Sequence, residues 1–162
     1  MSINDRLDLD IGLNLIDNGT SDDYYTPKWI FDAIGLEFDL DVSAPPGGIP
    51  WIPAKKHFTI IDDGLAQEWF GRVWMNPPYS DPTPWAKKFI AHNNGIALVQ
   101  ISKARWFNIL WEQTDAILVL PSNLRFTTAE GESKGIFMPC VLAAMGSDNI
   151  HAIKKSELGY TR

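Results

Sequence analysis

Apolar and polar residues alternate along this chain in the pattern of a domain built from both helices and strands. Short apolar runs at Val73–Met75, Ile96–Ile101 and Ala116–Leu120 predict buried strands. Apolar residues at helical spacing predict helices over 84–93 and 104–113, between those strands. Because strands that alternate with helices favour parallel pairing, the sequence predicts an α/β fold with a mainly parallel sheet.

The N-terminal part divides into a loose arm and the start of the folded domain. Residues 1–22 are acidic and weakly periodic, so we expect an arm, and we expect residues 23–162 to form a single domain. Thr26 has the chemistry of a helix N-cap and Pro27 that of a first helical residue. Gly35 follows the apolar face of this helix and is expected to end it.

The C-terminal part predicts a closing pair of strands. Leu124–Phe126 and Phe137–Met145 have the apolar content of strands and flank a polar stretch at 129–135 that contains glycine. We expect these last two strands to be antiparallel, with the polar stretch as the loop between them.

The run Asn76-Pro77-Pro78-Tyr79 is the clearest candidate for chemistry, because it follows the predicted strand Val73–Met75 directly. Two prolines fix φ near −65° and make the turn stiff. The side-chain oxygen of Asn76 and the carbonyl of Pro77 can then accept hydrogen bonds together, with the Tyr79 ring close behind. Two acceptors and a stacking face suit the amino group of a nucleobase, although a rigid surface turn is the alternative interpretation.

Two further loops fall at the ends of predicted strands, where open α/β sheets bind ligands. Asp41 lies near the end of the alternating run Phe38–Val42, and Asp62-Asp63 lies in a turn before Gly64. Asp41 suits a contact to an amine or a hydroxyl, but an Asx turn explains it equally well. A helix cap or a solvated turn explains Asp62-Asp63 without a ligand.

Composition narrows the range of partners. The net charge of −6 over 162 residues argues against broad binding to polyanions, although the basic residues concentrate in the second half of the chain. The three histidines, His57, His92 and His151, are far apart, so we predict no metal. The single cysteine, Cys140, excludes an intrachain disulfide and fits a reducing cytoplasm. Neither a membrane-spanning run nor a signal-peptide pattern is present, so no membrane association is expected.

The order of these motifs resembles the phage-type DNA N6-adenine methyltransferases (the phage Dam family). The likeness covers roughly residues 22–146. It is carried by Tyr25-Thr26-Pro27, Phe38-Asp39-Leu40-Asp41-Val42-Ser43-Ala44, Asp63-Gly64-Leu65 with Trp69, and Val73-Trp74-Met75-Asn76-Pro77-Pro78-Tyr79-Ser80.

The resemblance implies a Rossmann-like fold dependent on S-adenosylmethionine. It implies that Asn76 and Pro77 accept the hydrogens of a flipped adenine amine while Tyr79 stacks on the base. Asp41 would hold the amino-acid part of the cofactor, and Asp63 would lie between the cofactor and target pockets. The catalytic residues expected are Asn76, Pro77, Pro78 and Tyr79, and the cofactor-binding residues are Tyr25, Thr26, Pro27, Asp41, Ser43 and Asp63.

The resemblance also implies a partner and a setting. The substrate would be double-stranded DNA, methylated in the cytoplasm of a bacterial host by a phage- or prophage-encoded enzyme. A chain of this length leaves little room for a separate recognition domain, so loops or a second subunit (a homodimer) would read the sequence. Two alternatives stay open. The acceptor is RNA, a protein glutamine or a nucleotide, or the chain is a non-catalytic DNA-binding relic of the fold.

Overall fold

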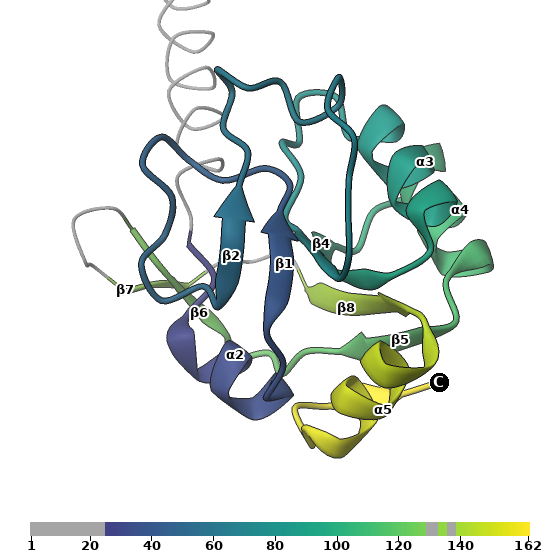
Figure 1. The fold of residues 1–162 in the computed structure, drawn as a ribbon. Helices are drawn as coiled ribbons and strands as arrows, with labels where there is room; N and C mark the ends of the chain where they lie inside the picture. Colours follow the sequence, from purple (N-terminus) through teal and green to yellow (C-terminus); the bar gives the residue numbers. More distant parts are fainter. Residues whose placement is uncertain (1–24, 129–132, 136–138) are drawn as a thin grey trace, which may run out of the picture.

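A seven-stranded sheet with helices on both faces forms the centre of the molecule (Figure 1). The computed structural model describes residues 25–128, 133–135 and 139–162, so the predicted arm over 1–22 lies outside the described residues. The strands, in spatial order, are β2 (Ala54–His57), β1 (Phe38–Asp41), β3 (Val73–Met75), β4 (Gly95–Gln100), β8 (Cys140–Met145), β5 (Ala116–Val119) and β9 (Tyr160–Thr161). The helices are α2 (Lys28–Ile34), α3 (Thr83–His92), α4 (Arg105–Gln113) and α5 (Ser147–Lys155).

The sheet is parallel on one side and antiparallel on the other. Strands β2, β1, β3 and β4 pair in parallel, so their carboxyl ends meet at one edge. Strand β8 runs antiparallel between β4 and β5, and β9 pairs antiparallel with β5 at the far edge. The mixed α/β architecture and the parallel block are therefore as the sequence predicts.

Alternate residues of the strands feed two apolar layers. On one face Trp74 and Leu118 pack with α2 and α5. On the other face Leu40 and Met75 pack with α3 and α4, whose buried residues include Phe89 and Leu110. Side chains of a strand point to opposite faces in turn, so a strand buried on both faces is apolar throughout. This explains the unbroken apolar runs in the sequence.

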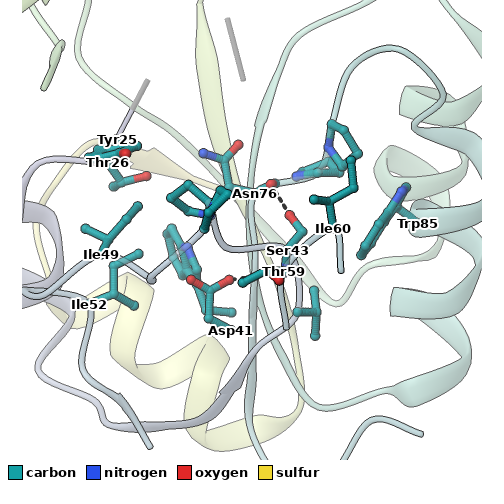
Figure 2. Close-up of a pocket in the computed structure, with 16 residues that line it drawn as sticks. Tyr25, Thr26, Asp41, Ser43, Ile49, Ile52, Thr59, Ile60, Asn76 and Trp85 are labelled. Carbon is teal, nitrogen blue, oxygen red and sulfur yellow. Dashed lines mark hydrogen bonds between the residues drawn. The ribbon is translucent and has the colours of Figure 1, made fainter. Parts of the chain in front are cut away.

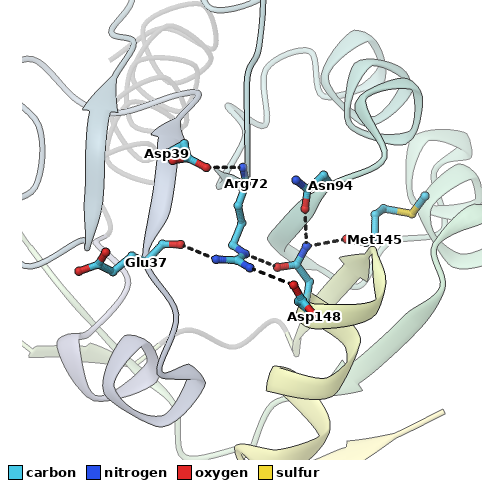
Figure 3. Close-up of polar contacts among 7 residues, drawn as sticks. Glu37, Asp39, Arg72, Asn94, Met145 and Asp148 are labelled. Carbon is cyan, nitrogen blue, oxygen red and sulfur yellow. Dashed lines mark hydrogen bonds and ion pairs between the residues drawn. The ribbon is translucent and has the colours of Figure 1, made fainter.

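A polar cluster joins α5 to the amino ends of the parallel strands (Figure 3). The Arg72 guanidinium donates to the Asn149 side-chain oxygen at 2.8 Å and to the Glu37 carbonyl at 3.0 Å. The fully buried Asn149 amide donates in turn to Asn94 Oδ1 and to the Met145 carbonyl. Buried polar groups are costly unless they are paired, and here every contact ties one element to another.

The prediction that Leu124–Phe126 and Phe137–Met145 pair with each other is wrong. Strand β6 (Arg125–Thr127) pairs with β7 (Ser133–Gly135), which lies inside the stretch predicted as a loop. Strand β8 instead enters the middle of the large sheet, where it pairs on both sides. Its six residues are all buried and apolar, which fits a central strand whose two faces are covered by the two apolar layers.

Two C-terminal elements were not predicted from the sequence. Helix α5 and the edge strand β9 follow β8, and α5 contributes Ala152 and Ile153 to the core. Within the described parts of the chain, none of the helices has the length and apolar character needed to span a lipid bilayer.

Candidate functional site

A cavity of about 240 Å³ opens at the carboxyl ends of β1 and β3 (Figure 2). A water molecule occupies about 30 Å³ in the liquid, so the cavity has room for a ligand of many atoms. Its walls come from four separate stretches of the chain. They are Tyr25 and Thr26, Asp41 to Ile52, Thr59 and Ile60, and Trp74 to Trp85; the lining residues are Tyr25, Thr26, Asp41, Val42, Ser43, Pro45, Pro46, Ile49, Ile52, Thr59, Ile60, Trp74, Asn76, Pro77, Pro78 and Trp85.

Asp41 is the buried acid of this cavity. It is the last residue of β1 and is only 4% exposed. Burial penalises the carboxylate and raises the pKa of Asp41 to about 7, against an ordinary value of 3.8, while the Ser43 N–H lowers it in part by donating to Oδ1 at 3.2 Å. This carboxyl therefore changes charge near neutral pH and would gain from a cationic partner.

Ser43 links the end of β1 to the Asn76–Tyr79 turn. Its hydroxyl donates to the backbone carbonyl of Asn76 at 2.5 Å, the dashed contact in Figure 2. The backbone around it is also fixed, because Val42 N–H donates to the Trp74 carbonyl and Ala44 N–H to the Phe58 carbonyl. The two strand ends are thereby held at a fixed separation across the cavity.

Tyr79 closes the other end of this turn. Its hydroxyl accepts a hydrogen bond from the Gln100 backbone N–H at 3.1 Å, and its ring lies 6.0 Å from the ring of Trp106. Asn76, Pro77 and Pro78 line the cavity, whereas Tyr79 packs beside it against the core. The turn is therefore anchored on both sides, by β1 through Ser43 and by β4 through Gln100.

Thr26 forms the opposite wall. It is 1% exposed, and its hydroxyl has no hydrogen-bond partner among the described residues. The segment is held from two sides: the Trp51 indole N–H donates to the Thr26 carbonyl, and Tyr25 forms an isolated antiparallel bridge with Thr127. A buried hydroxyl without a partner is costly, and this one belongs to a residue that lines the cavity.

The predicted role of Thr26 as a helix N-cap is wrong. Helix α2 begins at Lys28, its N-cap is Pro27, and no side chain caps it. Pro27 holds an extended φ and ψ, which leaves the Thr26 hydroxyl one residue too early to reach the first helical turn. Gly35 does end the helix in the left-handed conformation, as predicted.

A loop between Thr59 and Trp69 forms the rim on the Trp85 side. Gly64 is required here, since a Cβ at this position would lie 2.2 Å from the Val42 carbonyl and 3.0 Å from the Trp85 ring. Asp63, predicted as a site residue, is exposed on this loop with φ of 55° and does not line the cavity. Pro27 is buried but likewise does not line it.

The predicted residues thus gather at one place, apart from Pro27, Tyr79 and Asp63, which lie just outside the cavity wall. Sequence reasoning missed the apolar lining, namely Ile49, Ile52 and Ile60, because isolated isoleucines in irregular segments carry no periodic signal. Trp85, which lies in the helix predicted over 84–93, also lines the cavity.

Comparisons with known proteins cover this same region. A family model described as DNA N-6-adenine-methyltransferase (Dam) matches residues 15–142, which include every lining residue of the cavity. A curated protein from Haemophilus phage HP1 (strain HP1c1), named DNA N-6-adenine-methyltransferase, is 28% identical over 109 residues. That match covers 60% of this chain and 61% of the relative, so the chain spans about three fifths of that protein's length. No solved structure matches the chain.

Proposed function

The chain belongs to the DNA N-6-adenine-methyltransferase (Dam) family, and from this premise we propose that it transfers a methyl group from S-adenosylmethionine to the N6 amine of a flipped adenine in double-stranded DNA. One observation carries the proposal. The same cavity is bordered by a buried acid, Asp41, and by the rigid turn Asn76–Pro78, so a methyl donor and an amine acceptor can meet there.

The fold supports this interpretation. We propose that residues 23–162 form one catalytic domain with the Rossmann-like architecture of S-adenosylmethionine-dependent methyltransferases. The cavity lies beyond the carboxyl ends of β1 and β3, which are parallel neighbours, and this is where open α/β sheets bind their ligands. Strand β8 pairs antiparallel with β4, so it does not alter the parallel pairing of β1 and β3 that forms the cavity.

The residues at the Thr26 end of the cavity fit the cofactor. Asp41 gains stability from a cation, and the ammonium group of the methionine part is one. The Thr26 hydroxyl, which has no partner among the described residues, can donate to or accept from a polar group of the cofactor. Ile49 and Ile52 offer an apolar wall to the flat adenine ring of the cofactor. When bound, S-adenosylmethionine supplies an electrophilic methyl group on a sulfonium.

The Asn76–Pro78 turn fits the acceptor. The Asn76 side-chain oxygen and the Pro77 carbonyl would accept both hydrogens of the adenine amine, which leaves its nitrogen lone pair directed at the methyl donor. Ser43 fixes the Asn76 backbone, so these acceptors need no rearrangement during the reaction. The pair would hold both amine hydrogens; the methylated nitrogen is cationic and readily loses one of them as a proton to water, so no strong base is required.

The other end of the cavity would receive the base. Figure 2 places Ile60 and Trp85 on the far side of Asn76 from Thr26 and Ile49, so the amine clamp lies between two halves of the cavity. Tyr79 would stack on the base from outside the present wall, with its hydroxyl held by Gln100. An adenine amine is inaccessible inside a duplex, so the base must leave the stack to arrive here.

The test is a methyl-transfer assay with competing acceptors. The purified chain would be incubated with methyl-labelled S-adenosylmethionine and, separately, with duplex DNA of random sequence, structured RNA, free adenosine nucleotides and glutamine-containing peptide. We expect label on duplex DNA alone, and we expect it as N6-methyladenine after digestion and mass spectrometry. Label on another acceptor would mean that the Asn76–Pro78 turn binds an amine other than that of adenine in duplex DNA. Absence of transfer, together with absence of cofactor binding by calorimetry, would contradict the proposal.

The DNA sequence would be read by loops at the cavity mouth or by a second copy of the chain. Light scattering with and without duplex DNA distinguishes a monomer from a homodimer, and sequencing of DNA from expressing cells gives the methylated site.

A further inference from the structure

The turn Thr59–Asp62 displays two isoleucines to solvent beside the cavity. The Asp62 N–H donates to the Thr59 carbonyl at 3.0 Å, which closes a four-residue turn with Ile60 and Ile61 at its centre. Both isoleucines are 86% exposed. Central turn positions favour glycine, proline, asparagine, aspartate and serine, whereas β-branched apolar side chains are unusual there. Neither the fold nor the core explains this pair.

The turn is rigid. The Asp62 carboxylate accepts from the Thr59 N–H at 2.8 Å and from the Thr59 hydroxyl at 3.1 Å, and the first of these contacts lowers the pKa of Asp62. The Ile61 N–H donates to the Thr59 hydroxyl at 3.3 Å. The charge of Asp62 is therefore turned back onto the loop, and the isoleucines form the outer tip.

The rest of the loop is fastened to helix α3 and to the core. The Lys88 ammonium donates to the Leu65 carbonyl at 2.7 Å and also to the carbonyl of Gln67. The Trp69 indole N–H donates to the Gly64 carbonyl at 2.7 Å, and the Gln67 amide donates to the Asp62 carbonyl. The two isoleucines are thus presented by a braced platform, which lowers the entropy lost when they bind something.

The position of the tip points to one partner. Ile60 belongs to the cavity rim on the Trp85 side, and Ile61 does not line the cavity, so the pair bridges the site and its surroundings. The strand that leads into the turn, β2, carries the exposed Lys56, whose ammonium lies 5.4 Å from the centre of the Phe58 ring; its neighbour Lys55 is paired with Asp39 at 3.2 Å. Positive charge beside an apolar tip at the mouth of a base-accepting site matches a duplex, with phosphates outside and a base stack inside.

We propose that the Ile60–Ile61 tip is a wedge that enters the DNA base stack where the target adenine leaves it. This inference rests on the proposed function. An apolar side chain in the vacated position keeps neighbouring bases apart and slows return of the adenine, while Ile60 borders the half of the cavity that receives it. The wedge acts only when the target base is paired and stacked at the outset.

The test compares two duplexes that differ at one position. Both contain a site that the unaltered protein methylates; in one the target adenine is paired with thymine, and in the other it lies opposite an abasic position. We expect Ile61→Ser to lower kcat/KM on the paired duplex by about tenfold and on the abasic duplex by less than about threefold. With 2-aminopurine at the target position, the variant should give a smaller rise in fluorescence on binding.

Controls separate the wedge from other roles. Tyr160→Ser removes a side chain that is 90% exposed on β9, at the opposite edge of the sheet, and should change neither rate. Ile61→Ser should bind S-adenosylmethionine as tightly as the unaltered chain and should have the same mass by light scattering. Equal loss on both duplexes, weaker cofactor binding or a changed oligomeric state would overturn the wedge and leave the proposed function standing. Failure of the unaltered protein to methylate any DNA would remove both.

Discussion

Replacement of Asp41 by asparagine should make the ligand-free protein more stable at alkaline pH. The carboxyl is buried, and burial raises the pKa of Asp41 from its ordinary 3.8 to about 7. In the unfolded chain the group ionises near its ordinary value, so between these two values the unfolded state binds fewer protons than the folded state. Stability from this group is therefore present below the ordinary pKa and lost as pH rises to the folded pKa near 7.

The size of the effect follows from the shift. About three pKa units at 1.36 kcal/mol each amount to about 4 kcal/mol lost in full above pH 8, of which roughly 3 kcal/mol falls between pH 5 and pH 8. A whole domain is stable by only about 5–15 kcal/mol. The amide that replaces the carboxyl in Asp41→Asn would keep an oxygen acceptor for the Ser43 N–H and carry no charge, so the stability of the variant should lack this component.

Urea unfolding of both proteins at pH 5, 6, 7 and 8 measures the effect as a difference, which removes contributions from every other titrating group. We expect the advantage of Asp41→Asn over the unaltered protein to grow by roughly 3 kcal/mol across this range. Saturating S-adenosylmethionine should hold the Asp41 carboxylate ionised by its ammonium group, and the unaltered protein should then lose much of this pH dependence. Parallel stability curves for the two ligand-free proteins would refute the reasoning.

Three further predictions concern the residues that hold the site and the sheet. Ser43→Ala should lower kcat about tenfold with unchanged affinity for S-adenosylmethionine, because the Ser43 hydroxyl donates to the Asn76 carbonyl and so fixes the turn. Ser43→Thr keeps the hydroxyl and should restore kcat. Weaker cofactor binding with unchanged kcat would instead show that Ser43 binds the cofactor. Tyr79→Ala should lower kcat/KM for DNA methylation by the equivalent of about 1–3 kcal/mol, and Tyr79→Phe by much less, because stacking on the base needs only the ring. Equal losses in the two variants would show that the hydroxyl, which accepts from the Gln100 N–H, is the important group. Asn149→Ala should destabilise the fold by about 2–4 kcal/mol in thermal unfolding, because it removes the three buried hydrogen bonds that the Asn149 side chain makes with Arg72, Asn94 and the Met145 carbonyl. The adjacent Asp148→Ala, whose side chain is 83% exposed, should cost less than about 1 kcal/mol, and similar losses would contradict this account of the cluster.

Most of the parallel half of the sheet could be predicted because its elements carry their own local signals; the exception is the edge strand β2, whose residues are mostly polar and exposed. Strands β3 and β4 are unbroken apolar runs, and α3 and α4 have apolar residues at helical spacing. Their order along the chain also implies how they pair. In this half, local pattern and tertiary structure agree, which is the condition under which sequence reasoning works.

The C-terminal half could not be predicted in the same way, because pairing there is non-local. Nothing in the sequence of β8 states that it lies between β4 and β5 rather than beside β6. Strand β9 has only two residues and the short β7 lies in a polar stretch, so neither has the length to create a pattern. The position of β9 is set by its backbone pairing with β5, and that of β7 by its pairing with β6.

The candidate site divides along the same line. Asp41 is the last residue of β1 and Asn76 follows β3 directly, so the parallel pairing of these strands brings both residues to one edge of the sheet. Thr26 was associated with the site only through the family resemblance, and its physical significance, a buried hydroxyl without a partner among the described residues, appears only once the Trp51 and Tyr25 contacts are known. Ile60 and Ile61 looked like ordinary apolar residues until the turn displayed them.

Single-turnover methylation by two variants of Asn76 tests the central claim most directly. The amount of N6-methyladenine formed on a duplex would be measured by mass spectrometry for Asn76→Ala and Asn76→Asp, after calorimetry has established that both bind S-adenosylmethionine normally. Aspartate keeps a side-chain oxygen acceptor for the adenine amine, so this variant should retain measurable transfer, whereas the alanine variant should lose at least about 100-fold. Methylation by Asn76→Ala at the rate of the unaltered protein would contradict the account.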